Sequence, residues 1–429
     1  MKLWIKNGTL IDVDAKKFCP STDVLCEDGR IVTIGSNLDL KNFDGIVIDA
    51  KGLWISPGLI DMHAQLRDPG FPEEETLHSA IEAAKAGGYT GVVCTPNTDP
   101  VLDCGSVLQY VILKSEKEGF PIYPLGALTQ KNKGEQISEM GDLLENGAVG
   151  FADTTHPTMR TDILRCALEY AKTLGQVVCL DCEDTFLAED GMMHEGYQST
   201  VLGLKGIPSE AEYMIVARNI ALASLTGAAI HIQMVSTKES VELIAEAKAK
   251  GLLVTAETSA SYFALNCESM DAFNTSMKLR PPLRTREDMV AIRQAVEEGV
   301  IDVIVSAHAP QLREETHLEY ELAPKGAVGL ETSVGVTLNE WVHYEEETIA
   351  RIVAAMSLCP AQILGLKDKG LVKEGFAADI TLIDSEKEWV VDSTIFRSLS
   401  MNTPFEGKSL KGKVVATILN GRVVYEDYS

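Results

Sequence analysis

The chain has 429 residues, of which 45% are hydrophobic, enough for one large domain and a smaller one. A total of 38 lysines and arginines against 63 aspartates and glutamates gives a net charge of -25, which disfavours nonspecific binding to nucleic acid or anionic membranes. No apolar run reaches the roughly 20 residues that span a bilayer, and the N-terminus lacks a signal-peptide pattern, so we expect a cytoplasmic protein. The nine cysteines are scattered and odd in number, which favours reduced thiols.

The two ends of the chain share a β pattern. Residues 1–52 alternate short β-like runs with turns such as Asn7-Gly8 and Asp28-Gly29, which is typical of antiparallel strands. Residues 371–429 repeat the pattern, with Asn420-Gly421 as a hairpin signal. We therefore expect both termini to pair into one small β-sandwich.

Between the termini, residues 53–370 alternate buried strands with longer amphipathic segments. Eight strands are expected, at residues 59–63, 91–95, 122–127, 149–153, 177–181, 229–234, 253–255 and 303–306. Helical spacing marks residues 74–86, 159–174, 209–225, 240–250 and 287–298. This order predicts an α/β protein with a (β/α)8 TIM barrel, whose site lies at the C-terminal ends of the strands. A doubly wound open sheet is the rival fold, but no G-x-G-x-x-G or P-loop motif supports nucleotide binding.

Motifs at the predicted strand ends follow one another over most of the chain. They include Ser56-Pro57-Gly58-Leu59-Ile60-Asp61-Met62-His63, Leu66-Arg67-Asp68-Pro69-Gly70, Thr95-Pro96-Asn97-Thr98, Pro281-Pro282-Leu283-Arg284, Gly329-Leu330-Glu331-Thr332 and Asn402-Thr403-Pro404-Phe405. In these motifs the chain resembles the cyclic amidohydrolases, and most closely the class I dihydroorotases of pyrimidine biosynthesis. The resemblance implies a hydrolase framework with two divalent ions and an aspartate, after the last strand, that shuttles the proton.

The chain departs from that family at the residues that carry the chemistry. A His-x-His pair at a strand end points both imidazoles the same way, but Gln65 stands where the family has the second histidine after His63. Asp181 and Met234 each stand for a further histidine, whereas Asp153 is kept. Ala307 replaces the catalytic aspartate of the Thr-Asp-His-Ala-Pro motif, and loss of a general base typically costs about two to four orders of magnitude in rate. We therefore expect no catalytic residue at this position.

The remaining candidate ligands leave one metal-binding alternative open. His63, Asp153 and Asp181 offer one nitrogen and two carboxylates, which is compatible in principle with a single zinc ion that keeps an open position. We favour the expectation of no metal and no cofactor, because an aspartate is shorter than the imidazole it replaces. Asp153 and Asp181 are then hydrogen-bonded carboxylates at strand ends.

The resemblance also implies substrate-binding positions. Arg67 and Asn97 match the residues that bind the substrate carboxylate in dihydroorotases, and His308 matches a histidine that orients substrate or backbone. Arg280 replaces the family's asparagine, and it either binds an anion or forms a salt bridge with Asp153 or Asp181. The salt bridge is the favoured use.

Three functions follow from these patterns. The leading hypothesis is a catalytically inactive dihydroorotase homologue that acts as a structural partner of aspartate carbamoyltransferase. The alternative is a weak or altered metal-dependent cyclic-amide hydrolase of the dihydroorotase, hydantoinase or allantoinase type. A third is a binding module for a small carboxylate through Arg67 and Asn97. A homodimer is the default assembly, without nucleic acid or membrane.

Overall fold

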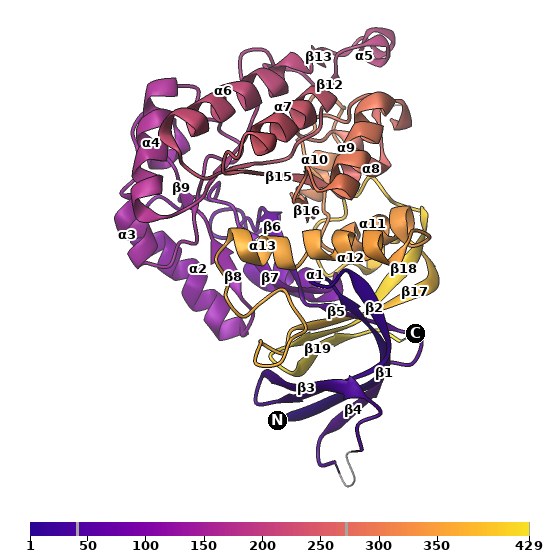
Figure 1. Cartoon of the computed structure of the whole chain (residues 1–429). Helices are drawn as coiled ribbons and strands as arrows, with labels where there is room; N and C mark the ends of the chain where they lie inside the picture. Colours follow the sequence, from indigo (N-terminus) through magenta and orange to yellow (C-terminus); the bar gives the residue numbers. More distant parts are fainter. Residues whose placement is uncertain (40–42, 271–272, 429) are drawn as a thin grey trace.

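The computed structural model describes residues 1–39, 43–270 and 273–428, and it is an α/β protein with a barrel and a terminal β-sheet (Figure 1). The barrel strands are β6 (Leu59–Ala64), β7 (Tyr89–Cys94), β8 (Ile122–Pro124), β9 (Gly126–Ala127), β10 (Phe151–Ala152), β11 (Val178–Leu180), β14 (Ile230–Ile232), β15 (Val254–Ser259) and β16 (Val303–Val305). All paired neighbours in this set run parallel. The amide of Gln65 donates to the carbonyl of His308 at 2.8 Å, which joins the first and last strands and closes the barrel.

Each of the eight expected strand segments overlaps a strand of the barrel, with β8 and β9 together forming the third. The fold class predicted from the sequence is therefore confirmed. The seventh strand is longer than expected, because β15 continues to Ser259 rather than ending at Thr255. This extension carries Glu257 into the centre of the barrel, where it is fully buried.

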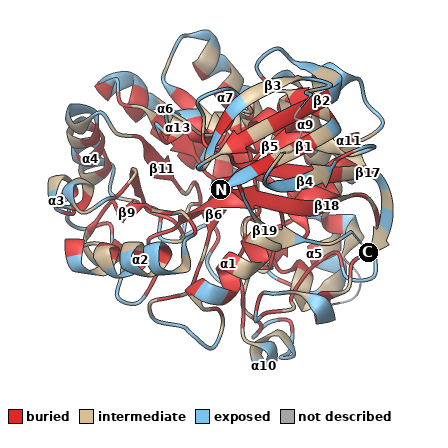
Figure 2. Cartoon of the chain, turned by 90° about the horizontal axis from the view of Figure 1, so that it is seen from below, coloured by how far each residue is buried: buried red, intermediate tan, exposed pale blue. Residues whose placement is uncertain are grey.

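Helices surround the barrel, and their outer faces are exposed while their inner faces are buried (Figure 2). They are α1 (Leu77–Ala86), α2 (Gly105–Glu118), α3 (Met140–Glu145), α4 (Thr161–Leu174), α6 (Glu210–Thr226), α7 (Lys238–Ala249), α9 (Arg286–Glu298), α11 (Ser333–Trp341), α12 (Glu346–Ala355) and α13 (Leu358–Ile363). Helix α9 starts one residue before the predicted segment at 287–298, where the side chains of Thr285 and Asp288 each accept the other's backbone N–H. Shorter elements lie in the loops: β12 (Met193–His194), α5 (Tyr197–Leu202), β13 (Gly206–Ile207), α8 (Ala260–Ala264) and α10 (Arg313–Thr316).

Both termini build one eight-stranded sheet. Its strands are β1 (Lys2–Asp12), β2 (Lys17–Glu27), β3 (Arg30–Ser36), β4 (Ile46–Asp49), β5 (Trp54–Pro57), β17 (Ile380–Val390), β18 (Ser409–Leu419) and β19 (Arg422–Glu426). Apolar side chains from the N-terminal and C-terminal strands, such as Ile5, Val24 and Ile418, pack into a common core. Strand β5 pairs with β1 and β17 and belongs to the same sheet. The domain limits at residues 52 and 370 stay predictions.

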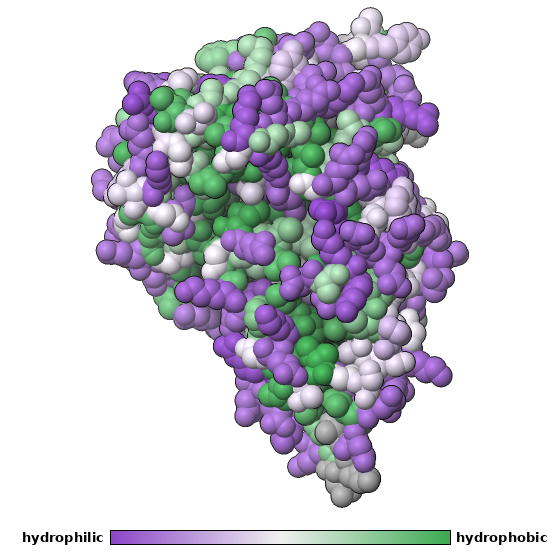
Figure 3. Space-filling model, in the orientation of Figure 1, coloured by the Kyte–Doolittle hydropathy of each residue, from purple (hydrophilic) through white to green (hydrophobic). Residues whose placement is uncertain are grey.

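The outer surface fits the acidic composition. Hydrophilic residues cover most of the outer helices on the face shown in Figure 3, and apolar groups gather mainly in the middle of that face. Within the described ranges, no helix combines the length and the apolar character needed to cross a membrane.

Candidate functional site

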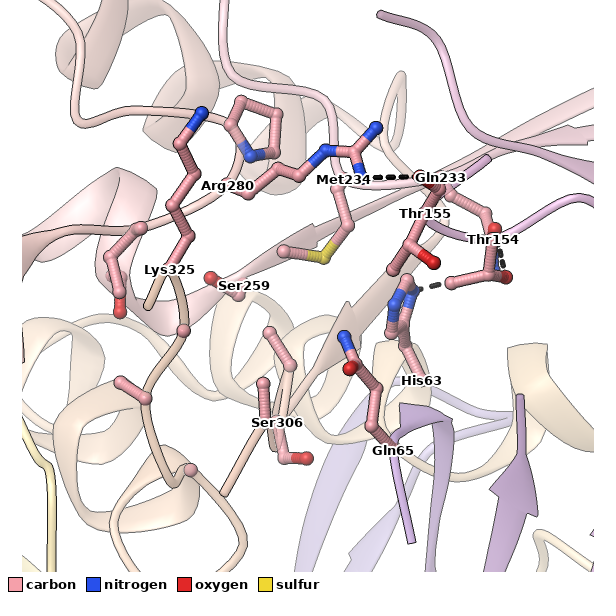
Figure 4. Close-up of a pocket in the computed structure, with 18 of the residues that line it drawn as sticks. His63, Gln65, Thr154, Thr155, Gln233, Met234, Ser259, Arg280, Ser306 and Lys325 are labelled. Carbon is pink, nitrogen blue, oxygen red and sulfur yellow. Dashed lines mark hydrogen bonds between the residues drawn. The ribbon is translucent and has the colours of Figure 1, made fainter. Parts of the chain in front are cut away.

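A cavity of about 650 Å³ opens at the C-terminal ends of the barrel strands, where the fold places the expected site (Figure 4). Residues that follow β6, β10, β11, β14, β15 and β16 line it together with the loop at residues 324–329. The sequence-predicted residues His63, Asn97, Arg67, Asp181 and Arg280 all reach this cavity. The structure therefore brings together side chains that lie more than two hundred residues apart.

His63, the first expected metal ligand, is bound to a carboxylate. Its Nδ1 lies 2.5 Å from Oε1 of Glu257, whose Oε2 lies 3.0 Å from Nε2 of His231. Burial is the largest single influence and lowers the pKa of His63, but the charge and hydrogen bond of Glu257, together with the charges of Asp61 and Asp181, raise the pKa above its ordinary value. Burial raises the pKa of Glu257, but the two histidines reverse the shift and bring the pKa to about 2. His63 is thus half of a buried ion pair.

The side chain of Gln65 forms a hydrogen bond with the side chain of Asn97. Its Oε1 accepts from Nδ2 of Asn97 at 3.1 Å, and Oδ1 of Asn97 accepts from the hydroxyl of Thr95 at 2.7 Å. Amide oxygens are poor ligands for transition metals beside imidazole or thiolate. The position that the family fills with a second histidine therefore fastens Asn97 to the end of β6.

Asp153 points at backbone amides. Its Oδ2 accepts from the N–H of Thr158 at 2.7 Å and its Oδ1 from the N–H of Asp181 at 2.9 Å. The residue is 1% exposed, and burial raises the pKa of its carboxyl to about 7. Asp153 does not occur among the described residues that line the cavity. It holds the end of β10 against the end of β11.

Arg280 lies between two carboxylates. Its guanidinium is 3.1 Å from Asp181 and 3.0 Å from Glu183, and its Nη1 donates to the carbonyl of Thr155 at 2.6 Å. The predicted salt bridge with Asp181 is confirmed. Burial raises the pKa of Glu183, and Arg280 opposes that shift. The guanidinium thus neutralises Asp181, the third expected metal candidate.

Arg67 is also bound within the protein. Its Nε and Nη2 both donate to the carbonyl of Pro310 at 3.1 Å, and its Nε lies 2.8 Å from a carboxylate oxygen of Glu74. These contacts occupy one edge of the guanidinium. A carboxylate ligand can therefore reach Arg67 only through the remaining N–H groups.

The last strand brings no carboxylate to the cavity wall. Ala307 lies at the cavity wall with φ of 52°, a left-handed conformation that aspartate and asparagine adopt more readily than alanine. Met234 has φ of 54° and also lines the cavity. His308 was expected to orient substrate or backbone; the substrate contact needs correction, because the side chain is fully buried behind the wall, whereas it does bind a backbone amide. Its Nε2 is 3.3 Å from Glu75, and its Nδ1 accepts from the amide of Gly329.

The donors at this site do not fit a divalent metal. His63 is paired with Glu257, both oxygens of Asp153 accept backbone N–H groups, and Asp181 is paired with Arg280. Among residues 1–39, 43–270 and 273–428, no three His, Cys, Asp or Glu side chains are arranged to hold an ion. A zinc ion would have to displace a guanidinium and break two hydrogen bonds to backbone. The single-zinc alternative is therefore not supported by these side chains.

Three residues of the cavity region were not anticipated from the sequence. Glu257 lies past the expected end of its strand, and Lys325 lies in a loop before the Gly-Leu-Glu-Thr motif. Glu183 lies two residues after Asp181. Since alternate residues at a strand end share a face, that spacing was a usable signal for Glu183. Nothing in the local sequence marks Lys325.

The barrel, the terminal sheet and the strand-end cavity define an amidohydrolase-type protein. A family model described as dihydro-orotase-like matches residues 52–240, and one described as amidohydrolase family matches residues 325–425. The chain is similar to a protein named dihydroorotase from Pelotomaculum thermopropionicum, with 47% identity over 427 residues that cover 100% of this chain and 99% of the relative. It is also similar to a protein named dihydroorotase from Syntrophus aciditrophicus, with 42% identity over 100% of both chains. The chain therefore belongs to the dihydroorotase family.

Solved structures of hydantoinases share the fold. The L-hydantoinase (dihydropyrimidinase) from Arthrobacter aurescens superposes with a TM-score of 0.87 at 24% identity, covering 99% of this chain and 96% of that one. The D-hydantoinase (dihydropyrimidinase) from a Thermus species gives a TM-score of 0.82 at 23% identity, covering 99% and 95%. These likenesses confirm the architecture.

Proposed function

We propose that this dihydroorotase-family protein does not open a cyclic amide by metal catalysis and acts instead as a non-catalytic structural partner, with aspartate carbamoyltransferase as the first partner to test. The observation that carries the proposal is the internal pairing of the site. The residues at the expected ligand positions are bound to Glu257, to backbone amides and to Arg280. Ala307, at the position of the proton shuttle, can neither coordinate nor transfer a proton.

The other candidate is a metal-dependent cyclic-amide hydrolase of the dihydroorotase type, and the comparisons with known proteins support it better than the non-catalytic candidate. The observation that favours it is the whole-chain likeness, at 42% and 47% identity, to relatives named dihydroorotase. This candidate requires His63, Asp153 and Asp181 to release their present partners. Either candidate associates the chain with pyrimidine biosynthesis, as the resemblance implies.

One experiment decides between the two. The chain is purified without chelator, and its zinc content and its rates of dihydroorotate hydrolysis and carbamoyl aspartate cyclisation are measured beside the Pelotomaculum relative. The non-catalytic proposal expects no stoichiometric zinc and no turnover above background. Stoichiometric zinc together with turnover that Asp153→Ala abolishes would establish the hydrolase and overturn the proposal.

The partner is tested separately. Tagged full-length chain is mixed with purified aspartate carbamoyltransferase from the same organism and run through size-exclusion chromatography with light scattering. A joint peak of defined mass supports the proposed partner, and two separate peaks remove it. The mass of the chain alone tests the expected homodimer.

A further inference from the structure

We propose that a second pocket, between the barrel and the terminal sheet, binds a small organic ammonium ion that keeps one N–H and carries alkyl groups, and that Glu331 accepts this N–H. Residues of α1, α11, β17, β18, β19 and the segment 392–397 line this interface pocket, and Figure 1 shows α11 beside β17 and β18. Among the described residues, none lines both this pocket and the cavity at the barrel strand ends. Its ligand therefore does not depend on whether the chain opens a ring.

The interface pocket has the size and the charge of a site for a small cation. Its volume of about 340 Å³ lies near the lower limit of the roughly 300 to 1,000 Å³ that ligand pockets occupy. Its described lining carries four acidic and two basic side chains, namely Glu331, Asp392, Glu426 and Asp427 against Arg397 and Lys413. The excess of negative charge favours a cation over an anion.

Glu331, which belongs to the Gly-Leu-Glu-Thr motif, has one carboxylate oxygen without a hydrogen bond. Its Oε1 accepts from the amides of Arg397 and Ser398 at 2.8 and 3.1 Å. Its Oε2 accepts no hydrogen bond and forms no ion pair with any residue that the structure describes. The guanidinium of Arg397 attracts the carboxylate only at longer range. An N–H of a ligand can therefore bind Oε2 without displacing a bond already present.

Three aromatic side chains, Trp389, Phe396 and Tyr425, supply the apolar walls. The faces of aromatic rings attract cations, and aromatic residues around a site are common receptors for alkylated ammonium ions. The ammonium of Lys413 lies 5.8 Å from the centre of the Trp389 ring and 2.6 Å from Asp427, so that ring and that carboxylate already face a cation. In the described ranges, no lysine or arginine lies over the rings of Phe396 and Tyr425. Alkyl groups on the nitrogen therefore suit these two rings.

The walls of the interface pocket are fixed by contacts within the protein. The indole N–H of Trp389 donates to the carbonyl of Gly412 at 3.0 Å. Gly335 lets α11 approach this ring closely, since a Cβ at that position would lie 2.6 Å from the indole. The two hydrogen bonds that Glu331 accepts hold the segment that carries Phe396. A pocket that is formed before its ligand arrives lowers the entropic cost of binding.

The test is a ligand-observed NMR titration of the full-length chain at pH 8. Burial raises the pKa of Glu331 to about 7, so its carboxylate is ionised there. The probes are N,N-dimethylethanolamine, a protonated amine with one N–H, choline, which keeps the charge without the N–H, and 3,3-dimethyl-1-butanol, the uncharged isostere of choline. We expect affinity to fall in this order, by about tenfold or more from the first to the last, because the alcohol makes neither the ion pair nor the cation–π contacts.

Two variants locate the ligand. Glu331→Gln keeps an oxygen for both amides, so it should fold, and it should weaken the binding of dimethylethanolamine about tenfold, the loss expected for one charge-assisted hydrogen bond. Tyr425→Leu should weaken both ammonium probes about threefold and leave the alcohol unchanged, because it replaces an aromatic ring with an apolar chain. Glu145→Gln, which removes an exposed carboxylate of α3, is the matched control and should bind normally.

Three outcomes overturn the inference. They are no saturable binding of dimethylethanolamine, equal affinity of the native chain and Glu331→Gln for it, or loss of binding in Arg397→Gln while Glu331→Gln binds normally, which would assign the pocket to an anion. Because these titrations involve neither zinc nor ring opening, they fail independently of the measurements that test the proposed function.

Discussion

The two ends of the cavity differ in whether their charged side chains form ion pairs. At the end built by β6, β11 and β15, charged side chains are paired at 2.5 to 3.1 Å, as in His63 with Glu257 and Arg280 with Asp181. At the end built by the 320–326 loop, the ammonium of Lys325 forms no hydrogen bond or ion pair with any residue that the structure describes. Paired charges stabilise a fold only while both members are present, whereas an unpaired buried charge is retained at a cost in stability. The pairing at the first end therefore contributes to the stability of the fold, whereas the ammonium of Lys325 adds no ion pair to it.

The largest expected effect comes from removing the guanidinium at the paired end. Arg280→Gln leaves Asp181 and Glu183 close together without a cation, and we expect the free energy of unfolding to fall by about 3 kcal/mol. Urea denaturation followed by circular dichroism measures it.

The matched control for that variant is the triple substitution Arg280→Gln, Asp181→Asn, Glu183→Gln. It removes the two carboxylates with the cation, so it should recover most of the lost stability. Equal stability of the native chain and the single variant would show that the ion pairs at this end contribute nothing, and the contrast between the two ends would then collapse.

A smaller loss is expected at the centre of the barrel. Glu257→Gln removes the carboxylate that two histidines share, and we expect a loss of about 2 kcal/mol at neutral pH. Because the pKa of Glu257 is lowered to about 2, its stabilisation is present above about pH 4.5 and disappears as the pH falls toward 2. The native and variant chains should therefore converge in acid.

The same variant gives a direct spectroscopic check. Without the charge of Glu257, the pKa of His63 should fall, and titration of its imidazole signal by NMR measures this. An unchanged pKa would mean that the two side chains are not an ion pair in solution.

Glu331 extends the comparison to an acidic group that is held by backbone amides. Its Oε1 accepts from the amides of Arg397 and Ser398, and burial raises the pKa of its carboxyl to about 7. A raised carboxyl pKa means that the folded state loses stability as the pH rises from about 4.5 through 7. Glu331→Gln keeps an oxygen for both amides, so it should be more stable than the native chain by about 1 kcal/mol at pH 8 and indistinguishable at pH 4. A difference that does not vary with pH would refute this assignment.

The smallest effect is expected at the unpaired end. Lys325→Met replaces an ammonium that burial disfavours, since burial lowers its pKa, with an apolar chain of similar length. We expect stability to be unchanged or to rise by about 0.5 kcal/mol in thermal unfolding. A loss comparable to that of Arg280→Gln would show that Lys325 is structural.

The sequence alone determined the architecture of this protein. Eight buried strand segments separated by amphipathic helical segments specified the barrel, because the spacing of apolar residues in strands and helices is a local property of the sequence. Asn420-Gly421 specified its hairpin, because both residues adopt positive φ. The sequence also identified the departures from the family pattern, since Gln65, Met234 and Ala307 differ in chemical type from the residues that the resemblance implies at these positions.

Only the tertiary structure decided what the remaining charges do. The pairing of His63 with Glu257 joins residues 194 positions apart, and the partners of Arg280 could not be chosen between Asp153 and Asp181 until β10 and β11 were placed side by side. The isolation of Lys325 depends on where every neighbouring carboxylate lies, which is a property of the whole fold. Hydrogen bonds and ion pairs act over a few ångströms. Positions in the sequence therefore do not show which side chains form them, and the folded structure of the barrel does.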